Sequence, residues 1–135
     1  MGTQQILMIV LSVIVVGAAV AVGIQMFDTQ ANNQARNAQI SDLMQMGVQA
    51  QAWHRQPELM RAGDGLPSMI DFIQRGATGT VITTPNGTYT FSGLTATQVV
   101  ITGVSSQNAA ISNIATVTLS GGGAPNYGIS IVAAP

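Results

Sequence analysis

The chain begins with an apolar run that water would not tolerate on its own. Residues 6–24, ILMIVLSVIVVGAAVAVGI, contain no charge, and only Ser12 and two glycines interrupt their apolar character. About 20 such residues cross a bilayer as a helix. The run therefore predicts a helix that either crosses a membrane or packs among apolar neighbours.

The next stretch, Gln25 to Arg55, also predicts helix. It has no Pro and one Gly, and good helix formers dominate it. Its apolar residues recur mostly three or four apart, which predicts a single stripe along one face: Phe27, Ala31, Ala35, Ala38, Ile40, Leu43, Met44, Val48 and Trp53. No cap or Pro separates the two stretches, and Pro57 is the first firm stop. We expect one continuous helix of about 50 residues in a first part, residues 1–56, whose segment 1–27 is apolar.

The second part, residues 57–135, predicts a short helix and then a small sheet. The expected helix covers 68–75, with Ser68 as its N-cap, Asp71 completing a variant capping box, and Gly76 as its stop. Alternating apolar and polar residues then predict strands within 80–133, at 80–84, 88–92, 98–104, 115–120 and 128–132. The stretch TTPNGTYT predicts a hairpin that turns at Pro85, Asn86 and Gly87.

These patterns together predict an α+β fold. A long N-terminal helix, apolar and then amphipathic, should pack on a small antiparallel sheet of about five strands. One face of the sheet is apolar and the other is rich in Thr and Ser.

Charge is scarce and unevenly placed along the chain. Charged residues make up 7% of the sequence, against about 25% in a typical soluble domain. All of them lie between Asp28 and Arg75, there is no Lys, and the net charge of −1 argues against nucleic acid as a partner. The absence of Cys excludes disulfides and thiolate metal sites.

The predicted sheet carries no charge at all, although edge strands normally use charges to avoid pairing with other molecules. Its surface is therefore either covered, by further copies or by sugars, or kept soluble by hydroxyl groups alone.

The apolar run has other interpretations. A secretory signal peptide has a basic start and a shorter apolar region, whereas residues 1–5 contain no Lys or Arg. N-myristoylation at Gly2 requires Ser or Thr where Ile6 stands. Small residues four apart, Gly17 with Ala21 and Ala19 with Gly23, permit close helix packing, but Gly and Ala are also common in any membrane helix.

The run MGTQQILMIVLSVIVVGAAVAVGIQMF and the helix up to Arg55, about 40% of the chain, resemble a mature type IV pilin. The resemblance implies a leader ending in Gly, cut by a prepilin peptidase that methylates the new N-terminal residue, here Met1. It also implies a membrane anchor that later forms the core of a cell-surface filament of many copies, built by a pilus assembly machinery and used in adhesion. No cofactor and no enzymatic activity are implied.

Two departures from the family pattern concern assembly. The family usually has Glu at the fifth mature position, where it pairs with a neighbour's N-terminal amine, whereas this chain has Gln5. An amide oxygen can still accept a hydrogen bond from that amine without burying a carboxylate. Many members also have a C-terminal disulfide, which this chain lacks. The resemblance also implies that the helix partly unwinds near the middle of its apolar segment during assembly, and Gly17 and Gly23 are the weak points of this chain.

The remaining candidate residues form no catalytic or metal constellation. His54, the only histidine, and Arg55 favour a helix C-terminus, and Asp64 and Asp71 flank the short helix. Gly121, Gly122 and Gly123 predict a hairpin loop, because the Lys and helix of a phosphate loop are missing. Asn86 begins an Asn-Gly-Thr glycosylation triplet at an exposed turn.

The sequence therefore predicts a filament subunit and not an enzyme. Two alternatives remain: a pseudopilin or minor pilin of a secretion or pilus system, and a single-span membrane-anchored surface binding module.

Overall fold

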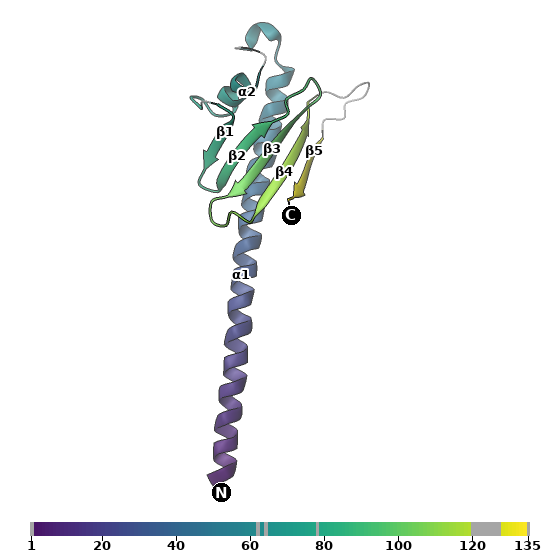
Figure 1. Cartoon of the computed structure of the whole chain (residues 1–135). Coiled ribbons are helices and arrows are strands. Elements are labelled where there is room, and N and C mark those ends of the chain that lie inside the picture. The colour runs from purple at the N-terminus through teal and green to yellow at the C-terminus, as the bar shows by residue number, and fades with distance from the viewer. Residues whose placement is uncertain (1, 62, 64, 78, 120–127, 135) are drawn as a thin grey trace. The chain divides into compact units, whose positions relative to one another are not determined.

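The computed structural model describes residues 2–61, 63, 65–77, 79–119 and 128–134. Its first element, α1, is an α-helix from Gly2 to Arg55 (Figure 1). The predicted continuation of the helix past Ile24 is confirmed. Contacts between residues divide the chain into two compact units, with the boundary inside α1 between Gln34 and Ala35.

The second unit contains the rest of α1, two short helices and one sheet (Figure 1). The short helices are η1, a 3₁₀ turn, and α2: Glu58–Met60 and Leu66–Ile73. The strands are β1 (Val81–Thr84), β2 (Gly87–Ser92), β3 (Gln98–Ser105), β4 (Ser112–Thr118) and β5 (Ile129–Ala133). All neighbours pair antiparallel in the order β1-β2-β3-β4-β5. The predicted α+β class, a long N-terminal helix packed on a five-stranded antiparallel sheet, is confirmed.

Alternation of side chains places the core between the sheet and α1. Tyr89 and Phe91 of β2 are buried, whereas the residues between and beside them are exposed. The same alternation buries Val99 and Ile101 of β3, and Ala115 and Val117 of β4. Strand β4 begins at Ser112, three residues earlier than expected. Its first buried residue is the polar Asn113, which a search for alternating apolar residues does not detect.

The predicted apolar stripe on the second half of α1 has the wrong phase. Of its members, Leu43 and Trp53 are buried, but Met44 and Val48 are 44% and 56% exposed. The face that meets the sheet includes small and amide residues: Gln39, Leu43, Met46, Gly47, Ala50, Gln51 and Trp53. A Cβ on Gly47 would lie 2.7 Å from Ile129 Cδ1 and 3.2 Å from Val117 Cγ2. The helix therefore meets the sheet most closely at a residue without a side chain.

A buried amide pair adds polar contact to this packing. The Asn113 Nδ2 donates a hydrogen bond of 2.7 Å to the Gln39 Oε1, and both residues are almost fully buried. On α1, Gln51 Nε2 similarly donates to the Thr118 backbone oxygen at 3.2 Å. Buried polar groups of this kind need partners, so these bonds favour one placement of this part of α1 on the sheet.

The predicted capping of the short helix is wrong. Helix α2 begins at Leu66, two residues before Ser68, with Gly65 as an N-cap that makes no side-chain hydrogen bond. Pro67 is well placed in this first turn, because the amide hydrogen that proline lacks has no helical partner there. Asp71 acts at the other end, where its Oδ1 accepts a 3.0 Å hydrogen bond from the Gly76 N–H. The helix ends at Ile73, and Gly76, with φ of 85°, belongs to the turn that follows.

The predicted hairpin is confirmed, with Pro85 and Asn86 as the two residues between β1 and β2. Gly87 is the first residue of β2, and it does not have a positive φ. A Cβ at this position would collide with the Val104 backbone oxygen of β3. Glycine is needed here because two backbones approach closely.

Candidate functional site

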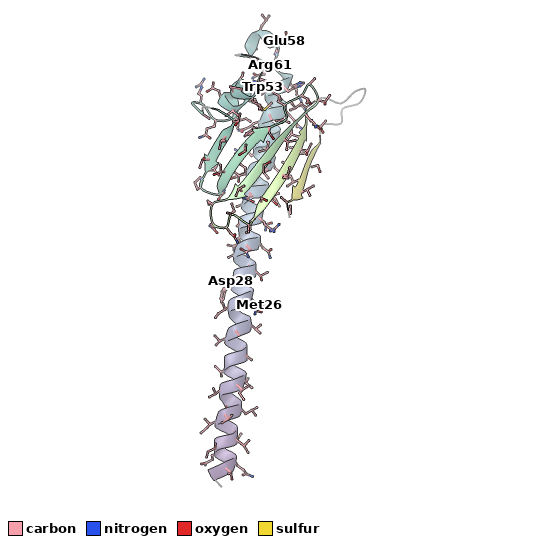
Figure 2. The ribbon with its side chains drawn as sticks, in the orientation of Figure 1. Met26, Asp28, Trp53, Glu58 and Arg61 are labelled. Carbon is pink, nitrogen blue, oxygen red and sulfur yellow. The ribbon has the colours of Figure 1, made fainter. Side chains whose placement is uncertain are left out.

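The unit up to Gln34 consists of helix whose apolar side chains have no protein around them. Every described residue in it except Gly23 is exposed, and Ile6 and Phe27 are 62% and 75% exposed. An 18-residue window of α1 has a mean hydropathy of 2.9 and is 0% buried. By length and composition the helix can cross a membrane. The apolar stretch ends between Met26 and Asp28, the first charged residue (Figure 2).

Two hydroxyl groups within this segment are bonded locally. Ser12 Oγ donates to the Met8 backbone oxygen at 2.8 Å, and Thr29 Oγ1 donates to the Gln25 backbone oxygen at 2.9 Å. An unpaired hydroxyl in hydrocarbon is costly, whereas a hydroxyl bonded to the preceding turn is tolerated. Ser12 therefore does not interrupt the apolar character of the run.

The predicted assembly residues lie on open surface. Met1 falls outside the described residues. Gln5 is exposed, and its amide bonds to no residue that the structure describes. Added Cβ atoms on Gly17 and Gly23 would meet nothing within 4 Å. Since each residue turns a helix by about 100°, the face of Gly17 and Ala21 lies about 200° from that of Ala19 and Gly23.

A polar cluster ties the second unit's part of α1 to the first hairpin. Asp42 Oδ2 accepts three hydrogen bonds, from Thr84 Oγ1 at 3.2 Å, Asn86 Nδ2 at 3.0 Å and Tyr89 OH at 2.9 Å. Asn86 is exposed at its turn, as expected for a glycosylation triplet, but the nitrogen that would carry a sugar already donates to Asp42. Burial of Tyr89, then its hydrogen bond to Asp42 and the charge of that carboxylate, raise the pKa of Tyr89 above its ordinary value.

Alkaline pH should weaken the fold through Tyr89. An unfolded tyrosine ionises near pH 10, whereas the raised pKa keeps folded Tyr89 protonated, so its contribution is complete below about pH 10 and is lost as the pH rises above it. We expect the free energy of unfolding to fall by about 1.4 kcal/mol between pH 9 and pH 11, and Tyr89→Phe to remove this fall. Denaturant titrations of both proteins at the two pH values measure the difference. An unchanged pH dependence in the variant would contradict the assignment.

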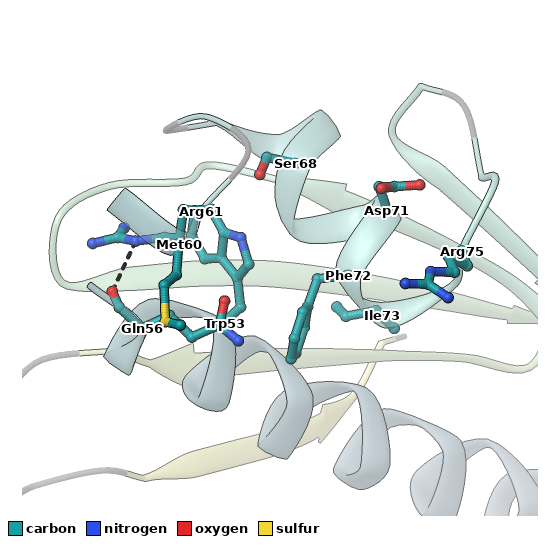
Figure 3. A pocket seen from close by; sticks show the side chains of 9 residues that line it. All are labelled: Trp53, Gln56, Met60, Arg61, Ser68, Asp71, Phe72, Ile73 and Arg75. Carbon is teal, nitrogen blue, oxygen red and sulfur yellow. Dashed lines mark hydrogen bonds between the residues drawn. The ribbon is translucent and has the colours of Figure 1, made fainter. Parts of the chain in front are cut away.

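A groove lies at the far end of α1, around Trp53. Trp53 is 3% exposed, and Arg61 covers its ring with the guanidinium carbon 5.1 Å from the ring centroid. Arg61 Nε donates to the Gln56 backbone oxygen at 3.0 Å (Figure 3). Beside them is a cavity of about 460 Å³, also lined by residues of α2 and its C-terminal end. Trp53, a member of the predicted apolar stripe, is therefore packed inside this end of the unit.

The described residues contain no cluster of three His, Cys, Asp or Glu side chains that could hold a metal ion. His54 lines a second hollow, with Glu58 and Arg61. Asp64 and the glycines at 121–123 lie outside the described residues. The sequence did not predict two sites, the Asp42 cluster and the groove. The gathering of charges between Arg55 and Arg75 was the one signal for the groove.

Comparisons of the chain with protein-family models, with curated proteins and with solved structures found no match.

Proposed function

We propose that this chain is a structural subunit that polymerises into a type IV pilus-like extracellular filament. The observation that carries the proposal is the helical segment up to Gln34, which is exposed along nearly its whole described length and is strongly apolar over residues 6–24. Such a surface is stable only in lipid or against other apolar surfaces. A filament subunit uses both environments, the membrane before assembly and the helices of other copies afterwards.

The two small-residue faces favour helix-to-helix packing over a lipid-facing anchor. A single anchor needs hydrophobicity alone, whereas close packing in an apolar medium needs residues that let backbones approach. Gly17 with Ala21 and Ala19 with Gly23 supply such surfaces on nearly opposite sides of the helix. One small face fits a dimer, and two fit a bundle in which each helix has several neighbours.

Residues at the N-terminal end fit the same proposal. Met1 is the residue that a prepilin peptidase would expose and methylate, and four residues later the exposed amide of Gln5 bonds to none of the described residues. In a bundle, the Gln5 oxygen accepts a hydrogen bond from a neighbour's N-terminal amine. The pilus assembly machinery and the inner membrane are the partners that this route requires, and the cell surface is the destination.

The sheet forms the exterior of the proposed filament. Residues 76–135 contain no charge, and the face of the sheet opposite α1 presents mainly Thr, Ser and Val. Identical uncharged faces do not repel one another, so many copies can be crowded around one axis without electrostatic cost.

Electron microscopy of material sheared from the native cells tests the proposal, with the subunit identified by mass. We expect thin, regular filaments built of this chain. Recovery of the chain only in the membrane, as single particles after detergent extraction, would contradict polymerisation and support the anchored-module alternative. A filament in which the chain is present only in trace amounts relative to another subunit would indicate a pseudopilin or minor pilin.

A further inference from the structure

The groove beside Trp53 has the size and composition of a small-ligand site. Its volume of about 460 Å³ lies within the range of known ligand pockets, about 300–1,000 Å³. It lies entirely within the unit that carries the sheet, between the C-terminal end of α1, η1 and α2. Figure 3 shows Ser68, Asp71 and Arg75 spaced along α2 and the turn after it, with Phe72 between Trp53 and Arg75.

The charge pattern of the unit singles out this groove. The described residues after Arg75 carry no charge, and apart from Arg36 and Asp42 on α1 the charged residues of the unit lie in the segment 55–75, which contributes to the groove. Three charged side chains line it: Arg61, Asp71 and Arg75. Among the described residues Arg75 has no hydrogen-bond or ion-pair partner, and Asp71 bonds through Oδ1 alone. The guanidinium of Arg75 and the second oxygen of Asp71 therefore remain available to a ligand.

An aromatic ring lies among these polar groups. Phe72 is 44% exposed, although Met69 and Ile70, its neighbours on α2, are fully buried. Ring carbons of this kind pack against the apolar C–H face of a sugar, while Asp and Ser side chains pair with sugar hydroxyls. The guanidinium fork of Arg75 matches a carboxylate bidentately.

We infer that this groove binds an acidic sugar, a hexuronic acid unit of a saccharide chain. Its carboxylate pairs with Arg75, its hydroxyls with Asp71 and Ser68, and its C–H face packs on Phe72. A neutral sugar has no negatively charged group that could pair with the net positive charge of the groove. The inference goes beyond polymerisation and does not depend on it.

Trp53 is the only tryptophan of the chain and lines the groove, so its fluorescence reports binding directly. The full chain in detergent is titrated with a trimer of galacturonic acid and, separately, with a neutral galactose trimer. We expect a saturable change with the acidic trimer at a dissociation constant below about 1 mM, and binding of the neutral trimer at least about tenfold weaker.

Variants locate the site. Arg75→Gln should weaken binding of the acidic trimer about tenfold, and Phe72→Leu, which keeps an apolar side chain but removes the ring, should weaken both trimers. Arg36→Gln makes the same charge change outside the groove and should bind as the wild type does. Circular dichroism confirms that each variant is folded.

Three results would overturn the inference. The first is the absence of a saturable fluorescence change up to about 10 mM of the acidic trimer. The second is an equal affinity for the acidic and the neutral trimer. The third is an Arg75→Gln protein that binds the acidic trimer as tightly as the Arg36→Gln protein does. Because the titration uses detergent-held chains, its failure leaves the filament proposal standing, and absence of filaments leaves the titration unaffected.

Discussion

Leu in place of Gly17 is expected to abolish filaments while leaving a folded protein in the membrane. The structure gives the reason for this separation of effects. A Cβ added at Gly17 meets nothing within 4 Å beyond the adjacent turns of its own helix, and Leu is a better helix former than Gly, so the variant should fold. Any loss of assembly must then arise between copies. A bulky residue that holds two helices apart should weaken subunit addition at least about a hundredfold, roughly 3 kcal/mol.

Ala21→Leu should have the same effect, because Ala21 lies one turn from Gly17 on the same face. Gly23→Leu tests the opposite face. Val20→Leu is the matched control, since Val20 lies about 80° away from the centre of each small face and is already a branched apolar residue. Filaments are counted by electron microscopy, and membrane fractions are probed for the chain. Normal filaments from both Gly17→Leu and Ala21→Leu would refute close packing, and loss of filaments in Val20→Leu would show that sensitivity is not confined to the small faces.

The sheet was predictable because its signal is local. A strand with one buried face alternates every second residue, so Tyr89 and Phe91, or Val117 and Ala115, reveal both the strand and its inner face. The long helix was predictable for a similar reason, since no Pro or cap interrupts residues 2–55. The face of the helix that is buried could not be predicted in this way, because it depends on the sheet against which the helix packs. Gln39 and Gly47 face the sheet through an amide bond and a close approach that no count of apolar residues detects.

The candidate sites also differ in how far the sequence alone predicts them. The apolar helix could be predicted from composition alone, because residues 6–24 form one uninterrupted uncharged run. The Asp42 cluster could not, because Asp42 and Tyr89 are 47 positions apart and meet only through the fold. The short helix shows how a local rule can fail when a stronger one competes. Ser68 has the chemistry of an N-cap, but Pro67 is favoured in the first turn, so the helix begins earlier.

Gly103→Val should destabilise the sheet unit more than any surface change. Gly103 pairs with Tyr89 across β2 and β3, and a Cβ on it would lie 2.8 Å from Tyr89 Cε1 and 2.9 Å from Cδ1. Because Gly103 has no side chain, the Tyr89 ring can lie against it. In this position the Tyr89 hydroxyl reaches Asp42. A branched side chain would displace the ring, overpack the core and break that hydrogen bond. Together these effects should cost about 3 kcal/mol, which lowers the melting temperature by about 15 °C in a unit of this size.

Thr102→Val is the matched control for this change, because it places the same side chain one residue earlier on β3. Thr102 lies on the opposite face of the sheet, between Thr90 and Ile114. There Val replaces a β-branched residue of equal size and meets no ring, so stability should change by no more than about 0.5 kcal/mol. Thermal unfolding of the full chain in detergent, followed by Trp53 fluorescence, compares the two variants. If Gly103→Val unfolds at the temperature of the control, the Tyr89 ring does not occupy the space over Gly103, and the alkaline destabilisation assigned to Tyr89 loses its structural cause.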